Sequence, residues 1–221
     1  MPETAPAETA RQPDFEFRDP ARLTKVVSAL LIVGAAASGG EALLKGAEYV
    51  ILASHRPFDE PAWIGIQALL NLLQLVLLVV TTIAFLMWVY RANWNAHALG
   101  AVDMRFRPGW AVGWYFIPLA NLWMPFRVMS EIWRVSANPG DWQNTPRSSV
   151  LGWWWALYLL HSGFNGAAYS DETGSVTQLM TDAVFAALAS LLGVALNLVA
   201  WRMIRKIAAN QLFQANVAQV F

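Results

Sequence analysis

The chain has 221 residues, no cysteine, and 15 basic and 15 acidic residues, so its formal net charge is zero. Hydrophobic residues make up 57% and charged residues 14%, against about 25% charged residues in a typical soluble domain. This composition excludes a disordered chain, a disulfide-stapled secreted domain and a basic nucleic-acid-binding protein. It favours an integral membrane protein instead.

The first 19 residues are rich in Pro, Ala and Glu, and we expect a disordered cytoplasmic tail rather than a signal peptide. A first membrane helix is predicted over about 23–53, with Asp19 as its N-cap and Pro20 at its first helical position. Counted from Pro20 it would be about 50 Å long, well beyond a hydrocarbon core of about 30 Å. The helix must therefore tilt, protrude or break, and the Ser-Gly-Gly sequence at 38–40 is the predicted weak point.

Three further apolar segments, at about 63–90, 148–168 and 179–204, are long enough to cross a bilayer. The helical pattern of the second continues to Leu99, and Gly100 is its predicted stop. The fourth follows a capping-box pattern at 175–178, and residues 211–221 are expected to form a short C-terminal tail. The predicted fold class is therefore all-α, a polytopic bundle of four transmembrane helices within a single membrane domain over 20–210.

A fifth apolar stretch, 109–128, contains Pro118, Asn121 and Pro125. A lipid-exposed helix cannot leave so many backbone groups unsatisfied. We expect a short helix over 109–117, a turn at Pro118, and a second helix from Pro125 to about 136. Together these form a Pro-bounded re-entrant or interfacial helical hairpin, about 109–136, between spans two and three. A kinked fifth span is the alternative.

The distribution of basic residues separates these two topologies, because cytoplasmic loops carry excess Lys and Arg. With the N-terminus inside and no crossing at 109–128, only Lys45 and Arg56 of the 15 basic residues lie outside. A fifth crossing would also move Arg127, Arg134, Arg147 and the three cations at 202–206 outside. In the four-span arrangement, by contrast, most of the 12 tryptophans lie at the inner face, where they would form an aromatic belt. We therefore expect four spans with both termini cytoplasmic.

Three strings in the middle of the chain are distinctive: Trp-Val-Tyr-Arg-Ala-Asn at 88–93, Pro-Gly-Trp-Ala-Val-Gly-Trp at 108–114, and Ile-Pro-Leu-Ala-Asn-Leu-Trp-Met-Pro at 117–125. This region resembles the bacterial domain of unknown function 4328 (DUF4328), a family of multi-span membrane proteins. The resemblance is strong over about 85–160 and weaker over the first and last spans. It implies a bacterial inner-membrane protein, and it brings no activity and no catalytic or binding residues.

A first set of candidate binding residues is cytoplasmic. Arg127, Glu131 and Arg134 fall at i, i+4 and i+7 of the helix after Pro125, opposite apolar positions such as Met129. One interpretation places the apolar side in the membrane interface and the charged side in water, where each pair contributes a few tenths of a kcal/mol. The other is a face for anionic lipid headgroups or a protein partner, worth about 1 kcal/mol per arginine. The complete candidate face consists of Arg91, Arg105, Arg107, Arg127, Glu131 and Arg134.

A second set lies in the outer halves of the predicted spans and consists of Glu41, Asn71, Gln74, His161 and Asp182. Ionisable groups within spans are costly and often functional, so these residues could form an outward polar vestibule. They could equally form interhelical hydrogen bonds of about 0.6 kcal/mol each. Glu41 can also be neutralised by Lys45 one turn later.

No nucleophile, base and orienting group are spaced for catalysis, and the three histidines have no metal-ligand spacing. We therefore expect no catalytic residues, no metal and no cofactor, and a non-enzymatic membrane scaffold or a partner- or lipid-binding component. The alternatives are a small-solute or ion transporter using the outward cluster, and a membrane enzyme acting on a lipid-like substrate. Small residues at 35–40 and at 183, 186, 187 and 190 suit helix packing, within the bundle or in a homo-oligomer.

Overall fold

The computed structural model describes residues 15–54, 60–167 and 175–220, which form helices and turns without a β-strand. The α-helices are α1 (Ala21–Ala53), α2 (Glu60–Ala98), α3 (Pro108–Gly113), α4 (Met124–Ala137), α5 (Ser149–Ala167) and α6 (Val176–Val220). Short 3₁₀ turns are η1 (Trp114–Phe116), η2 (Ala120–Leu122) and η3 (Pro139–Asp141). The chain is therefore all-helical over its described residues, as the sequence predicts.

Within the described residues, three helices are long and apolar enough to cross a membrane: α1, the part of α2 from Trp63, and α6 as far as Ala218. Helix α5, with 19 residues, does not meet the same criterion of length and apolar composition. Helix α1 is continuous through 38–40, so the break considered there does not occur. Helix α2 ends where the sequence predicts, because Gly100 adopts a left-handed φ of 81° just after it.

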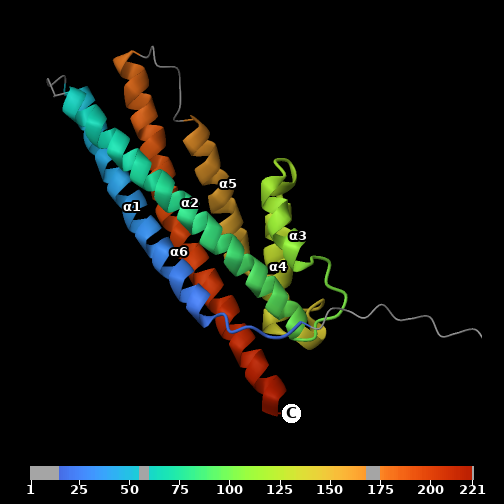
Figure 1. Ribbon diagram of the computed structural model, residues 1–221. Helices are drawn as coiled ribbons and strands as arrows, with labels where there is room; N and C mark the ends of the chain where they lie inside the picture. The colour runs from blue at the N-terminus through green and yellow to red at the C-terminus, as the bar shows by residue number, and fades with distance from the viewer. Residues whose placement is uncertain (1–14, 55–59, 168–174, 221) are drawn as a thin grey trace, which may run out of the picture.

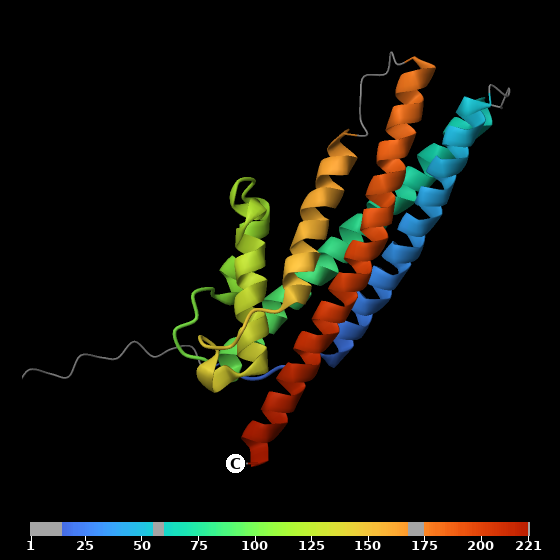
Figure 2. The same cartoon turned by 180° about the vertical axis from the view of Figure 1, so that it is seen from behind.

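Helix α6 is the centre of the bundle, with α1 and α5 packed along it and α2 beside α1 (Figure 1). In both views α1 begins and α6 ends at the same end of the bundle, the lower end in Figure 1 (Figures 1 and 2). Helix α2 ends there and α5 begins there. We call it the basic end, because Arg18, Arg22, Arg91 and three cations of α6 (Arg202, Arg205 and Lys206) belong to it.

The hydrophobic core also lies toward the basic end, where α4 packs against α2 and α6. Met129 and Ile132 of α4 are fully buried with Trp88 of α2 and Met203 of α6. The interpretation that placed the apolar side of α4 in the membrane interface is therefore wrong. The hairpin folds back onto the bundle, so this side is covered by protein.

The segment before α1 crosses the end of α2. The Arg18 backbone N–H donates to Asn95 Oδ1 (3.0 Å), and Asn95 Nδ2 donates back to the Arg18 carbonyl (2.7 Å). Trp94 Nε1 donates to the Glu16 carbonyl (2.8 Å). The Asp19 side chain accepts the Ala21 N–H (2.8 Å), as predicted for a capping residue, although Pro20 occupies the N-cap position and α1 begins one residue later than predicted. Residues 15–19 are thus held against α2, whereas 1–14 of the predicted tail lie outside the described residues.

The last part of α6 also belongs to the bundle. Gln211 is fully buried, and its Nε2 donates to the Ala92 carbonyl (2.8 Å) and to Ser136 Oγ (3.1 Å). Its Oε1 accepts a hydrogen bond from Asn95 Nδ2 (3.3 Å). Residues 211–220, which were expected to form a tail, instead continue helix α6. Hydrogen bonds from Gln211 to polar groups of α2 and α4 hold this part of the helix against the bundle.

Candidate functional site

Two elements of the hairpin position the candidate site. The chain leaves the basic end along α3, turns through η1 and η2, and comes back along α4 (Figure 1). At the turn, Asn121 Nδ2 donates to the hydroxyl of Tyr158 on α5 (3.1 Å). The predicted helix–turn–helix over 109–136 is present, with both of its ends at the same end of the bundle.

A cavity of about 890 Å³ lies on one side of α4, between that helix and the loops on either side of the hairpin. Four arginines line it, against two carboxylates: Arg105, Arg127, Arg134 and Arg147, with Asp103 and Glu131. Apolar residues at the start of α4 line it as well: Trp123, Met124 and Phe126. The cavity therefore combines a basic part with an apolar part.

Glu131 does not face water as one interpretation of its spacing assumed, because its side chain is only 4% exposed. Its Oε2 accepts the backbone N–H of Arg105 (3.0 Å), and its Oε1 accepts that of Phe106 (3.1 Å). Burial raises the pKa of this carboxyl, against the opposing effects of the two N–H groups and of the charges on Arg105 and Arg134. Glu131 thus fastens the loop before α3 to α4.

Arg134 shapes the opposite wall. Its Nε donates to the Thr145 carbonyl (2.8 Å), and its guanidinium also donates to the Gln143 carbonyl. The same group lies 5.5 Å from the ring centroid of Trp142, whose Nε1 donates to the Val102 carbonyl (2.9 Å). Arg134 therefore holds the loop after α4 in place.

Arg127 and Arg147 are exposed at the cavity, and their side chains make no hydrogen bond or ion pair with any described residue. Ser130, one turn after Arg127, is only 7% exposed, and its Oγ has no hydrogen-bond partner among the described residues. Arg147 was not among the residues predicted from sequence. It lies in a loop without periodic spacing to α4, and the hydrogen bonds of Arg134 bring that loop to the cavity.

The structure thus assembles part of the predicted cytoplasmic face. Arg105, Arg127, Glu131 and Arg134 line the cavity, and Arg91 and Arg107 do not. Arg91 donates to the Asp19 carbonyl instead (3.1 Å), and Arg107 immediately precedes α3.

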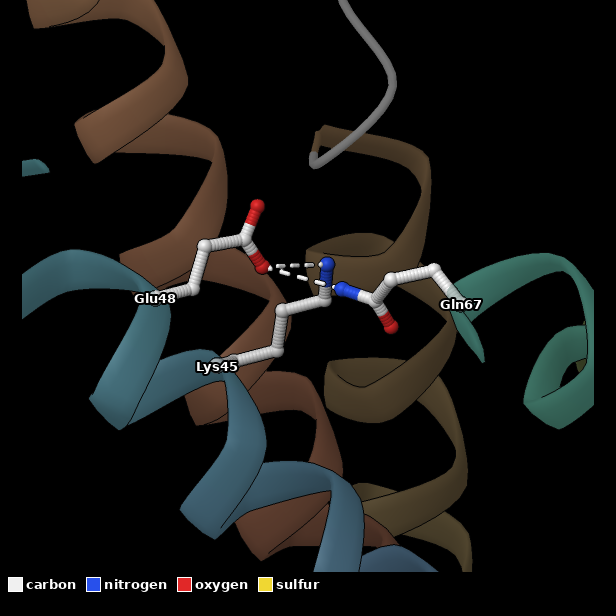
Figure 3. A network of polar contacts seen from close by, with 3 residues as sticks. All are labelled: Lys45, Glu48 and Gln67. Carbon is white, nitrogen blue, oxygen red and sulfur yellow. Dashed lines mark hydrogen bonds and ion pairs between the residues drawn. The ribbon is translucent and has the colours of Figure 1, made fainter. Parts of the chain in front are cut away.

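The polar residues that the sequence analysis placed in the outer halves of the spans divide into separate groups. Glu41, Asn71 and Gln74 line a pocket of about 280 Å³ between α1 and α2, in which Gln74 Nε2 donates to Glu41 Oε2 (3.1 Å). Lys45 pairs with Glu48 (2.9 Å), not with Glu41 as its spacing suggested. Gln67 Nε2 donates to the same Glu48 oxygen (3.1 Å), so this network joins α1 to α2 (Figure 3).

His161 and Asp182 do not line this pocket. His161 Nδ1 lies 2.8 Å from the Ala189 carbonyl of α6, and Asn165 bonds to the His161 carbonyl one turn away (3.0 Å). Asp182 lies on α6 and is not without an interaction partner. The five predicted residues therefore do not form one vestibule.

An all-helical chain with three helices long and apolar enough to span a bilayer has the form of a membrane protein. The family model for the domain of unknown function DUF4328 matches residues 63–209, and the chain belongs to this family. The matched region includes the hairpin and the whole cavity lining. Comparison with curated proteins and with solved structures gives no match.

Proposed function

We propose that this protein is an integral component of the bacterial inner membrane that crosses the bilayer four times, with both ends in the cytoplasm. It acts there as a non-enzymatic binding component, and the cavity on α4 is its working surface. The observation that carries this proposal is the gathering of four arginines, two of them with side chains free of partners among the described residues, around a cavity at one end of an apolar bundle.

The distribution of charge supports the orientation. Among the described residues, Lys45 is the one Lys or Arg that lies in the half of the bundle away from the basic end. The other described Lys and Arg residues belong to the basic end or to the hairpin. Because cytoplasmic segments are enriched in Lys and Arg, the basic end faces the cytoplasm.

The path of the chain supports a fourth crossing by α5. Helix α5 starts at the basic end, and α6 starts at the opposite end (Figure 2). At 19 residues, α5 is about 28 Å long, close to the hydrocarbon thickness of about 30 Å. Its tryptophans at 153–155 lie near its cytoplasmic start, where such rings favour the membrane interface.

The chemistry of the cavity favours binding over catalysis. Both oxygens of Glu131 already accept backbone N–H groups, and Ser130 has no base hydrogen-bonded to its hydroxyl among the described residues. A hydrolase needs a nucleophile, a base and an orienting group in contact. Arginines with uncommitted donors are suited instead to holding an anion. A transporter is less well supported, because the outer polar residues lie in separate groups.

The topology can be tested by single-cysteine labelling, since the chain contains no cysteine of its own. In intact cells, an impermeant maleimide should label Ser54→Cys and Ser175→Cys, which lie at the outer end of the helices. Ser149→Cys, at the start of α5, and Asn216→Cys should react only after permeabilisation. Labelling of Ser149→Cys from outside would mean that the hairpin region crosses the membrane, and it would overturn the proposed orientation.

A further inference from the structure

We propose that the cavity on α4 binds the phosphate of an anionic phospholipid, with the acyl chains leaving it past Trp123, Met124 and Phe126. The inference rests on the proposed function, since it names the ligand of the same cavity. Three features of the lining support it: the charge, a buried hydroxyl without a partner, and the apolar end.

The first feature is charge. The lining contains four arginines and two carboxylates. One of these carboxylates, Glu131, already accepts hydrogen bonds from two backbone N–H groups. Arg134 is committed to the loop carbonyls, and the charge of Arg105 acts on Glu131. The guanidinium groups of Arg127 and Arg147 have neither kind of partner among the described residues. Guanidinium groups bind phosphate oxygens through paired hydrogen bonds, so the cavity suits a phosphate.

The second feature is Ser130. Its hydroxyl is buried and lacks a partner among the described residues, although buried hydroxyl groups in folded proteins are nearly always hydrogen-bonded. Ser130 follows Arg127 by three residues and precedes Arg134 by four, so the three side chains share one face of α4. A phosphate oxygen held by Arg127 would be placed to accept a hydrogen bond from the Ser130 hydroxyl.

The third feature distinguishes a lipid from a soluble phosphate. Trp123, Met124 and Phe126 line the cavity where α4 begins, next to a hairpin turn whose Phe116, Leu119 and Leu122 are exposed. This turn points away from the basic end, alongside α5 (Figure 1). Contiguous exposed apolar residues beside the cavity are suited to contact with lipid. The volume of about 890 Å³ lies within the range of small-molecule sites.

The test uses the full chain purified in detergent and titrated with lipid, with bound lipid counted by native mass spectrometry. Phosphatidylglycerol should bind at least tenfold more tightly than phosphatidylcholine with the same acyl chains, and glycerol 3-phosphate should bind weakly. Arg127→Gln and Arg147→Gln should each weaken phosphatidylglycerol binding about tenfold, and Ser130→Ala about threefold, as expected for lost hydrogen bonds to a charged group. Arg202→Gln, an exposed cation of α6 outside the cavity, is the matched control.

Equal weakening in Arg202→Gln would show that lipid binds by general surface charge, and it would overturn the site. Equal binding of phosphatidylcholine would overturn the role of the arginines. Tight binding of glycerol 3-phosphate alone would replace the lipid by a soluble phosphate ester. Thermal unfolding of each variant identifies any that fails to fold. If one of the two arginine variants fails to fold, lipid binding by the other arginine variant decides whether the site exists. Since a detergent titration does not depend on orientation, and cysteine labelling does not depend on lipid, the two proposals can fail independently.

Discussion

Gln211 lies in α6 with its side chain enclosed by groups from α2 and α4. It forms hydrogen bonds with the Ala92 carbonyl, the Ser136 hydroxyl and the Asn95 amide, which would otherwise be buried with fewer hydrogen bonds. In a polar sequence near the end of a chain, nothing local indicates such a role. Its importance follows from its partners, because leaving a buried polar group unsatisfied costs about 1–3 kcal/mol.

We therefore expect Gln211→Ala to lower the free energy of unfolding by about 2–3 kcal/mol, since it removes the hydrogen bonds of Gln211 to Ala92, Asn95 and Ser136 and opens a cavity. Asn216→Ala, at an exposed position of the same helix, should change stability by less than about 0.5 kcal/mol. Denaturant or thermal unfolding in detergent measures both. If the two variants were equally stable, the end of α6 would not be packed as described.

Glu131 predicts a dependence of stability on pH. Its folded pKa is raised by burial above the value of an exposed glutamate, so the folded state binds this proton more tightly than the unfolded state. Stability from this group is thus fully present below the unfolded pKa of about 4.3 and is lost as pH rises through the folded pKa.

Replacing Glu131 by Gln should remove this component, so the difference in melting temperature between wild type and variant should change between pH 4 and pH 7. The variant also loses one of the two acceptors for the N–H groups of Arg105 and Phe106, at a cost of about 1–3 kcal/mol. Glu16→Gln, at an exposed side chain, should leave the profile unchanged. A constant difference across this pH range would contradict the raised pKa.

At the scale of elements, α1 and α6 pack closely at two glycines, where an added Cβ would press against a neighbouring side chain. A Cβ at Gly193 would lie 3.0 Å from Ser38 Oγ and 3.3 Å from His161 Cε1. A Cβ at Gly34 would lie 3.0 Å from Asn197 Oδ1. Ser38, one of the small residues that the sequence indicated as a packing face, thus serves a contact inside the bundle, because in lipid close backbone approach and van der Waals contact hold helices together.

Gly193→Leu should accordingly separate α6 from α1 and α5 and destabilise the protein by about 1–3 kcal/mol through overpacking. Gly152→Leu is the matched control, because a Cβ there meets no atom within 4 Å. Unfolding in detergent and the yield of monodisperse protein measure the effect. Equal tolerance of both leucines would show that α1 and α6 are farther apart than in the structure.

At the scale of the whole molecule, the two ends of the helical chain come together. Helices α1 and α6 pair along their lengths, and the segment before α1 is fastened to α2, whose Asn95 also bonds to Gln211. Each of these contacts joins residues more than 70 positions apart in sequence. These contacts join the elements at the basic end, and it is there that the hairpin and its cavity are held.

Much of the architecture follows from local signals. The bounds of the predicted helices over 23–53 and 148–168 agree with those of α1 and α5 to within a few residues, because apolar runs and flanking prolines mark them directly. Pro118 and Pro125 likewise predict the hairpin, and Gly100 the end of α2. These features depend on backbone geometry and hydrophobicity within one segment, which a sequence records.

The sequence by itself therefore determined that the chain is helical, largely apolar and interrupted at the hairpin, and that it resembles DUF4328 proteins. Only the tertiary structure decided that Glu131 is buried, that Gln211 belongs to the core, and that Arg147 joins Arg127 at one cavity while Arg91 does not. The physical reason is that a polar side chain is satisfied by whatever donor or acceptor the fold places beside it. Those partners come from segments far away along the chain, so neither spacing nor composition reveals them.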